Sequence, residues 1–179
     1  MKYGGTPPKL STLHVKKEKI MSLHKRQEWG MNISEISDSD IQEEFVKRFT
    51  IRAGEHISGA RAAADHFRGF FADAAKKEKF VVCFLNSQHE VLSTEVLFEG
   101  SLDTSAVYPR QVIERVLDLG AGAVMIAHNH PSGSITPSSS DRAVTKKLET
   151  ALSSVDVALL DHLIVAGIDH FSFSDHRLI

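Results

Sequence analysis

The sequence has few of the features that mark secreted, membrane-spanning or strongly phosphate-binding proteins. It holds one cysteine, Cys83, so no internal disulfide can form, and the surrounding run FVVCFL is typical of a buried thiol. No apolar run approaches the roughly 18 residues that a membrane-spanning helix needs. The basic N-terminus lacks the apolar segment of a signal peptide. The default expectation is a cytoplasmic protein with no membrane partner.

An excess of charge of one sign is also missing. The formal net charge is −2 over 179 residues, which does not indicate a strong phosphate-binding surface but is compatible with a local basic patch. Hydrophobic residues make up 42% and charged residues 25% of the chain, as in globular proteins. The length suffices for one core of ordinary size, and two full domains would be crowded.

Residues 1–57 have the character of a peripheral segment. They open with the linker-like stretch GGTPPK and continue into the densely charged KKEKIMSLHKRQEW. After Ser39, the segment DIQEEFVKRF is acidic early and basic late, which predicts a short helix with Ile41, Phe45 and Phe49 on one face. We expect an arm or short helical segment that packs on the main domain, contacts a partner or stays partly disordered.

From Ser58 to the end, the hydrophobic pattern predicts alternating helices and strands. Strands are expected at 79–86, 91–100, 121–128, 157–167 and 170–175, with the first two forming a hairpin. Helices are expected at 58–77, from Pro109 to Gly120 and from Ser138. The buried face of the second helix is expected to comprise Val112, Ile113, Val116 and Leu117. This order indicates an α/β or α+β fold in which helices cover a mixed sheet.

The stretch AHNHPSGSITPSSSD at 127–141 gathers the residues with the clearest chemistry. His128 and His130 fall where the third predicted strand ends, and side chains at i and i+2 of an extended chain point to the same side. A loop shaped by proline and glycine then returns the chain to Ser138 and Asp141, where a helix begins. Two imidazoles and one carboxylate form the three-ligand set typical of catalytic zinc, which keeps a fourth position for water.

A simpler interpretation of this stretch exists. Ser138-x-x-Asp141 is also a helix-capping pattern, which needs no metal, and two histidines at this spacing occur by chance in many proteins. Metal-assisted hydrolysis would also need a base for the water proton. The carboxylates to consider in the preceding strands are Glu78, Glu90, Glu95 and Glu99. Spacing alone leaves both interpretations open.

The order His-x-His, seven residues, Ser, two residues, Asp resembles the JAMM (MPN+) metallohydrolase motif. HNHPSG followed by TPS resembles one branch of that group, the RadC-like JAB domain proteins of bacteria. EKFVVCFLN, FEGSL, YPRQVIERVL and LLDHLIVAG agree with this likeness, which covers about Ser58 to Ile179. For residues 58–179 the resemblance implies a JAB/MPN-like (cytidine-deaminase-like) mixed sheet sandwiched by helices.

The resemblance also implies a site chemistry. Glu78 would act as the general base, with Glu95 as the fallback because it lies in the neighbouring strand, and Ser138 would donate a hydrogen bond to the oxyanion. The reaction would be zinc-dependent cleavage of an amide bond in a peptide or protein, such as the tail of a ubiquitin-like modifier. One Zn²⁺ per chain would be held by His128, His130 and Asp141.

Two departures from the RadC-like pattern stand out. Ser134 occupies a position after HNHPSG that is often acidic in these proteins, and residues 1–57 cannot be assigned to the N-terminal helix-hairpin-helix segment that relatives often carry. The missing segment and the near-neutral charge weaken the case for a nucleic-acid partner. An accessory factor in DNA repair or recombination, and a catalytically silent interaction module, stay open as alternatives. So does a homodimer.

Asp161 and His162 form a polar pair inside the apolar run ALLDHLIVAG. Buried polar groups need hydrogen-bond partners. We therefore expect either a structural pair with satisfied hydrogen bonds or a pair that supports the metal ligands from behind.

Overall fold

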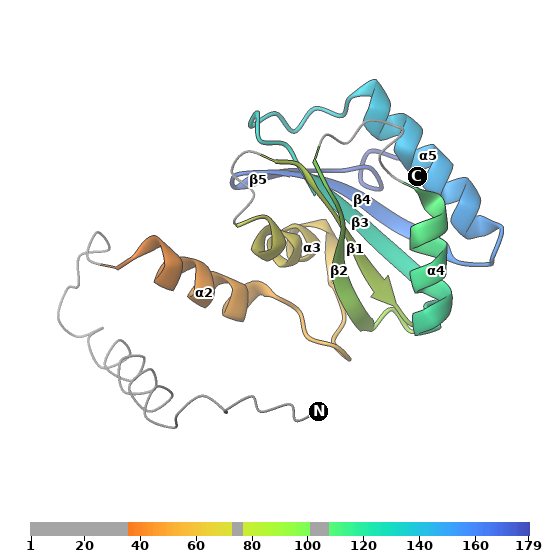
Figure 1. Cartoon of the computed structure of the whole chain (residues 1–179), viewed down its shortest axis with the longest axis horizontal. Helices are drawn as coiled ribbons and strands as arrows, with labels where there is room; N and C mark the ends of the chain where they lie inside the picture. The colour runs from red at the N-terminus through yellow and green to blue at the C-terminus, as the bar shows by residue number, and fades with distance from the viewer. Residues whose placement is uncertain (1–35, 73–76, 101–107) are drawn as a thin grey trace, which may run out of the picture. The chain divides into compact units, whose positions relative to one another are not determined.

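The computed structural model describes residues 36–72, 77–100 and 108–179. The chain divides into two compact units, Met1–Ile41 and Gln42–Ile179, and the fold of the second unit is considered below (Figure 1). The short helix predicted after Ser39 is confirmed as α2 (Asp38–Phe49). The linker-like opening and the charged segment up to Trp29 lie outside the described residues. The predicted domain boundary at residue 57 stays a prediction.

In the described part of the chain, one mixed sheet forms with the strand order β2-β1-β3-β4-β5. Strands β3 and β4 are parallel, and the other neighbouring pairs are antiparallel, including the predicted β1–β2 hairpin. The strands are β1 (Lys79–Leu85), β2 (Val91–Glu99), β3 (Ala123–Asn129), β4 (Ala158–Ala166) and β5 (Asp169–Ser172).

Helices cover both faces of this sheet (Figure 1). Helix α3 (Gly59–Arg68) and the short 3₁₀ helix η3 (Gly69–Phe71) pack on one face, and α4 (Pro109–Leu119) and α5 (Ser139–Ser153) pack on the other. Because neighbouring residues of a strand face opposite sides, a strand buried on both faces is apolar throughout. In β1, Val81, Cys83 and Leu85 pack toward α3, and Phe80, Val82 and Phe84 pack toward α4 and α5.

The observed sandwich is the predicted α/β architecture and agrees with a JAB/MPN-like fold. Helix α4 begins with Pro109 and ends at Gly120, which has φ +63°. Its predicted buried face is wrong at one position, because Leu117 is 66% exposed. At 3.6 residues per turn, Leu117 lies about 140° around the helix from the fully buried Val112 and so falls outside the stripe that the sheet covers.

The connection between β3 and β4 places the candidate site. These two parallel strands are joined through α5, so the carboxyl end of β3 leads into the loop before the first turn of that helix. In α/β sheets this is where ligands commonly bind. No helix within the described ranges is long and apolar enough to cross a membrane.

Candidate metal centre

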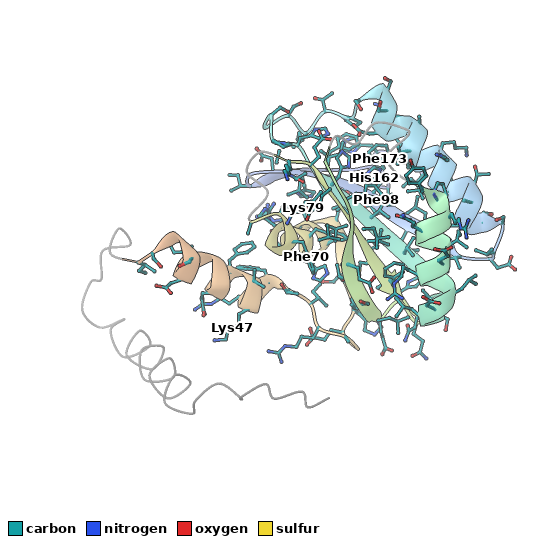
Figure 2. The ribbon with its side chains drawn as sticks, in the orientation of Figure 1. Lys47, Phe70, Lys79, Phe98, His162 and Phe173 are labelled. Carbon is teal, nitrogen blue, oxygen red and sulfur yellow. The ribbon has the colours of Figure 1, made fainter. Side chains whose placement is uncertain are left out.

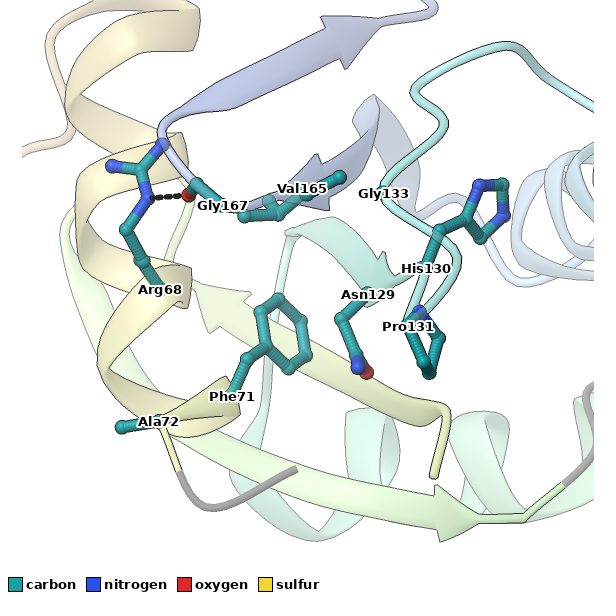
Figure 3. Close-up of a pocket in the computed structure, with 10 residues that line it drawn as sticks. Arg68, Phe71, Ala72, Asn129, His130, Pro131, Gly133, Val165 and Gly167 are labelled. Atoms are coloured by element: carbon teal, nitrogen blue, oxygen red, sulfur yellow. Dashed lines mark hydrogen bonds between the residues drawn. The ribbon is translucent and has the colours of Figure 1, made fainter. Parts of the chain in front are cut away.

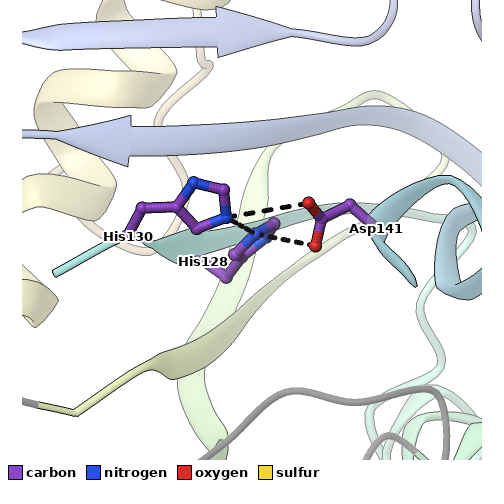
Figure 4. A group of neighbouring side chains, drawn as sticks. All are labelled: His128, His130 and Asp141. Atoms are coloured by element: carbon purple, nitrogen blue, oxygen red, sulfur yellow. Dashed lines mark hydrogen bonds and ion pairs between the residues drawn. The ribbon is translucent and has the colours of Figure 1, made fainter. Parts of the chain in front are cut away.

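His128, His130 and Asp141 come together at the end of β3 (Figure 4). Nε2 of His128 lies 2.9 Å from Nε2 of His130 and 3.2 Å from Oδ1 of Asp141. Nε2 of His130 lies 3.7 Å from Oδ2 of Asp141. One nitrogen or oxygen atom from each residue lies within 4.8 Å of the other two, so the group could hold a metal ion.

Local sequence explains how the three side chains converge. His128 and His130 project from the same side of the strand end, as expected for alternate residues. Gly133, with φ +81°, shapes the loop that follows. Ser138 caps α5: its hydroxyl accepts the Asp141 N–H at 3.1 Å, and Asp141 Oδ2 accepts the Ser138 N–H at 2.7 Å. The capping interpretation is confirmed and is compatible with a metal centre, because Oδ1 of Asp141 still faces His128.

The electrostatics of the three groups fit a cation. Burial alone would raise the pKa of Asp141, but hydrogen bonds with His128, His130 and Ser138 hold it well below its usual range, so the carboxyl is ionised. The hydrogen bond with Asp141 raises the pKa of His130. His130 donates its Nδ1 hydrogen to the Ser134 carbonyl, 2.6 Å away, which leaves Nε2 as the lone-pair atom of the neutral ring. A metal ion would replace the proton that this anionic site otherwise attracts.

The hydroxyl of Ser138 is already engaged in this arrangement. It donates to Asp141 Oδ2 at 2.7 Å. To donate to a reacting oxyanion, as the family resemblance implies, the hydroxyl would have to rotate away from Asp141. The role of Ser138 in the reaction therefore stays a prediction.

Glu78 lies immediately before β1, and its negative charge contributes to raising the pKa of His130. The side-chain amide of Asn129 forms hydrogen bonds with the backbone on both sides of Glu78. Asn129 Oδ1 accepts the Lys79 N–H at 2.7 Å, and its Nδ2 donates to the Lys77 carbonyl at 3.0 Å. The alternation of side chains along a strand predicts only that Asn129 points away from the two histidines. Its tie to the segment around Glu78 joins positions about fifty residues apart and has no local signal.

The other candidate carboxylates have different partners. Both oxygens of Glu95 accept hydrogen bonds from Arg115, at 2.7 and 2.9 Å, and these bonds lower the pKa of the Glu95 carboxyl. Glu90 accepts a hydrogen bond from Asn86 at 2.7 Å, and Glu99 lies 3.6 Å from the ammonium group of Lys79. The effect of the Glu78 charge on the pKa of His130 favours Glu78 over Glu95 as the candidate base.

Asp161 and His162 have separate roles in the structure. Asp161 accepts hydrogen bonds from the Ser172 hydroxyl at 2.6 Å and the Ser174 N–H at 3.0 Å, and so anchors the turn after β5. His162 is fully buried and lies behind the candidate metal centre, with Nε2 2.8 Å from Nδ1 of His128. Its ring stacks on Phe173, with 4.7 Å between the ring centroids. Figure 2 labels both residues. Burial lowers the pKa of His162 well below its ordinary value, so the ring is neutral.

A groove of about 350 Å³ opens beside His130 (Figure 3). Pro131 and Phe71 contribute apolar walls, and Asn129 contributes a polar group. Arg68, at one end, uses its guanidinium to hold the carbonyls of Gly167 and Ile168 at 2.8 and 3.1 Å, so it shapes the groove. The groove offers access next to the candidate metal ligands.

The fold and the His/His/Asp group define a JAB/MPN-like domain with a candidate metal centre. The chain belongs to the RadC-like JAB domain family, whose model matches residues 57–178. The resemblance drawn from the sequence motifs is therefore confirmed.

Relatives with similar sequences carry UPF0758 names. UPF0758 protein YfjY of Escherichia coli (strain K12) is 40% identical over 134 residues, which are 75% of this chain and 83% of that protein. YeeS of the same strain is 47% identical over 104 residues, covering 58% and 70% of the two chains. A UPF0758 protein of Aliivibrio salmonicida (strain LFI1238) is 48% identical over 103 residues, covering 58% of this chain but only 46% of that protein. This chain thus matches about half the length of the Aliivibrio relative, and the names state no activity.

Proposed function

We propose that this chain is a zinc-dependent hydrolase of the metallopeptidase or isopeptidase type, which cleaves an amide bond in a peptide or protein. The observation that carries the proposal is the convergence of two imidazole Nε2 atoms on an ionised, buried carboxylate at the open end of β3. Zinc bound there would supply Lewis acidity to the substrate carbonyl and to the attacking water. His128, His130 and Asp141 would hold one ion and leave a position open.

The proton transfers would depend on Glu78. A carboxylate beside the ligands can accept the proton of the attacking water and return it to the leaving amine. Asn129 supports this role because its amide is bonded to the backbone on both sides of Glu78, at Lys77 and Lys79. Ser138, once rotated away from Asp141, would donate to the oxyanion. The groove beside His130 would receive the polypeptide, of which the tail of a ubiquitin-like modifier is one example.

Two matched substitutions test this proposal. Glu78→Gln and Glu95→Gln each remove one negative charge. Glu78 precedes β1 and Glu95 lies in the adjacent strand β2, but of the two only Glu78 contributes to raising the pKa of His130. We expect both variants to keep zinc at the wild-type level, measured by elemental mass spectrometry. Glu78→Gln should lower cleavage by at least about a hundredfold, the usual scale for losing a general base. Glu95→Gln should cleave as the wild type does.

Cleavage can be followed without a known substrate by incubating the zinc-loaded full chain with a peptide mixture and identifying new termini by mass spectrometry. Chelation of zinc should stop the appearance of these termini. A wild-type chain that binds no zinc would overturn the hydrolase proposal. A fully active Glu78→Gln variant would overturn only the assignment of the base.

A further inference from the structure

A line of hydrogen bonds runs through the core behind His128 and returns to Asp141. Nδ1 of His128 lies 2.8 Å from Nε2 of His162, and Nδ1 of His162 lies 2.6 Å from Oγ1 of Thr145. Oγ1 of Thr145 lies 2.6 Å from the carbonyl oxygen of Asp141, one turn earlier in α5. All four residues are buried, with exposed fractions of 6% or less. Bulk water therefore cannot substitute for any partner in this line.

The direction of each hydrogen bond in the series follows from the final acceptor, the carbonyl oxygen of Asp141. A carbonyl oxygen can only accept, so the Thr145 hydroxyl donates to Asp141. The Thr145 oxygen must then accept the hydrogen on Nδ1 of His162. A fully buried imidazole with no carboxylate in hydrogen-bond contact is neutral, so Nε2 of His162 carries a lone pair. That lone pair accepts the hydrogen on Nδ1 of His128.

The geometry assigns His162 and Thr145 as positioning residues that fix His128 in the tautomer whose Nε2 lone pair faces the metal ion. This assignment rests on the proposed metal centre, because its consequence is a ligand atom prepared for zinc. The opposite tautomer would place a hydrogen on Nε2, 3.2 Å from Asp141 Oδ1, and would block coordination. The last hydrogen bond of the series is accepted by the backbone carbonyl of Asp141. The first turn of α5 therefore supplies the candidate ligand Asp141 and also the acceptor that fixes the tautomer of His128.

The two histidine ligands are therefore held by different means. His130 donates its Nδ1 hydrogen to the Ser134 carbonyl in the loop, which directly fixes its tautomer. His128 lies inside the core, where its acceptor is a second imidazole that could itself exist in two tautomers. Thr145 removes that ambiguity. Partners of this kind orient metal-bound histidines, and their loss typically weakens metal binding by about ten- to a hundredfold.

Two threonines of α5 provide a matched test. Thr145 and Thr150 both donate to the carbonyl four residues earlier, at 2.6 and 2.9 Å, but only Thr145 also contacts a histidine. Thr145→Val should lower zinc affinity at least about tenfold, measured on the full chain by competition with a chromogenic chelator. Thr150→Val should stay within about twofold of the wild type, and Thr145→Ser should restore the wild-type affinity. Thermal unfolding of the metal-free proteins reports whether each variant folds.

Nitrogen-15 NMR of the histidine-labelled wild-type chain reads the tautomers directly and needs no buried substitution. In the zinc form, Nδ1 of His128 and of His162 should each carry a hydrogen. A His162 with the hydrogen on Nε2, or a Thr145→Val variant that folds and binds zinc as the wild type does, would overturn the inference. If the wild type bound no zinc, the hydrolase proposal would fail separately. The tautomer of His162 in the metal-free chain would still decide this inference, because Thr145 and the Asp141 carbonyl fix it without a metal ion.

Discussion

Two buried histidines, His66 and His162, lie on opposite faces of the same sheet. Each forms a hydrogen bond with a threonine hydroxyl, but the two pairs have different roles. His66 of α3 donates its Nε2 hydrogen to Thr94 of β2 at 2.9 Å and accepts the Ile51 N–H on Nδ1, also at 2.9 Å. His162 of β4 is held in the opposite tautomer by Thr145. Burial lowers the pKa of both rings. They differ in what the second nitrogen meets: a backbone N–H for His66, and a candidate metal ligand for His162.

This comparison shows that burial and a depressed pKa do not by themselves mark a functional histidine. His66 joins the segment before α3 to the edge strand β2, which β1 separates from the strand that carries the His/His pair. Its role is to satisfy a backbone donor inside the core. His162 packs against Phe173 and also accepts the hydrogen on Nδ1 of His128, which fixes the tautomer of that ligand.

The largest expected effect is a loss of zinc affinity on substitution of His128, which the same substitution of His66 on the other face of the sheet should not cause. His128→Ala should weaken zinc binding more than about a hundredfold, because it removes a ligand rather than a supporting contact. His66→Ala should leave zinc affinity within about twofold but lower the free energy of unfolding by about 2–4 kcal/mol, through a cavity and an unpaired Ile51 N–H. Calorimetric zinc titration and urea unfolding of the metal-free chains measure the two quantities. Loss of zinc in the His66 variant would contradict the division between the faces.

A second prediction concerns acid stability on the α3 face. Burial lowers the pKa of His66 from 6.5 to about 4. Between these values the unfolded chain binds a proton that the folded chain does not, so folding stability rises with pH across this window and is lost on acidification. His66 should account for up to about 3 kcal/mol of this loss.

The substitution His66→Gln isolates that contribution. Glutamine can accept from Ile51 and donate to Thr94 without titrating, so the variant should show a shallower fall in unfolding free energy from pH 6.5 to 4. Equilibrium urea unfolding at a series of pH values gives the difference from the wild type. Parallel curves for the two proteins would mean that His66 is not held neutral by burial.

The smallest expected effect comes from the threonine on the α3 face. Thr94→Val removes the acceptor of the His66 Nε2 hydrogen and should lower the free energy of unfolding by about 1–2 kcal/mol. Zinc affinity should be unchanged, in contrast to the loss expected for Thr145→Val. Chemical unfolding together with chelator competition tests both statements. Equal loss of zinc affinity in the two threonine variants would indicate a general loss of stability in place of a tautomer effect.

Local patterns allowed much of the fold and the ligand set to be predicted. The apolar run of β1 predicted a buried strand, and Pro109 and Gly120 marked the ends of α4. The spacing of His128, His130 and Asp141 predicted a group that does converge. These signals lie within one strand, one helix or one loop, where geometry repeats with a fixed period.

The sequence by itself therefore determined which side chains form the candidate centre and which helix begins at it. Only the tertiary structure decided which buried side chains form hydrogen bonds with these residues and with their neighbours in the chain. His128 and His162 are 34 residues apart, His162 and Thr145 are 17 apart, and Asn129 and Lys79 are 50 apart. Each contact depends on strand register, which shifts in the β3–β4 pairing between Val124 and Met125. A one-residue slip turns a strand's side chains to the opposite face. No local pattern therefore specified that His162, and not Asp161, forms a hydrogen bond with the candidate metal ligand His128.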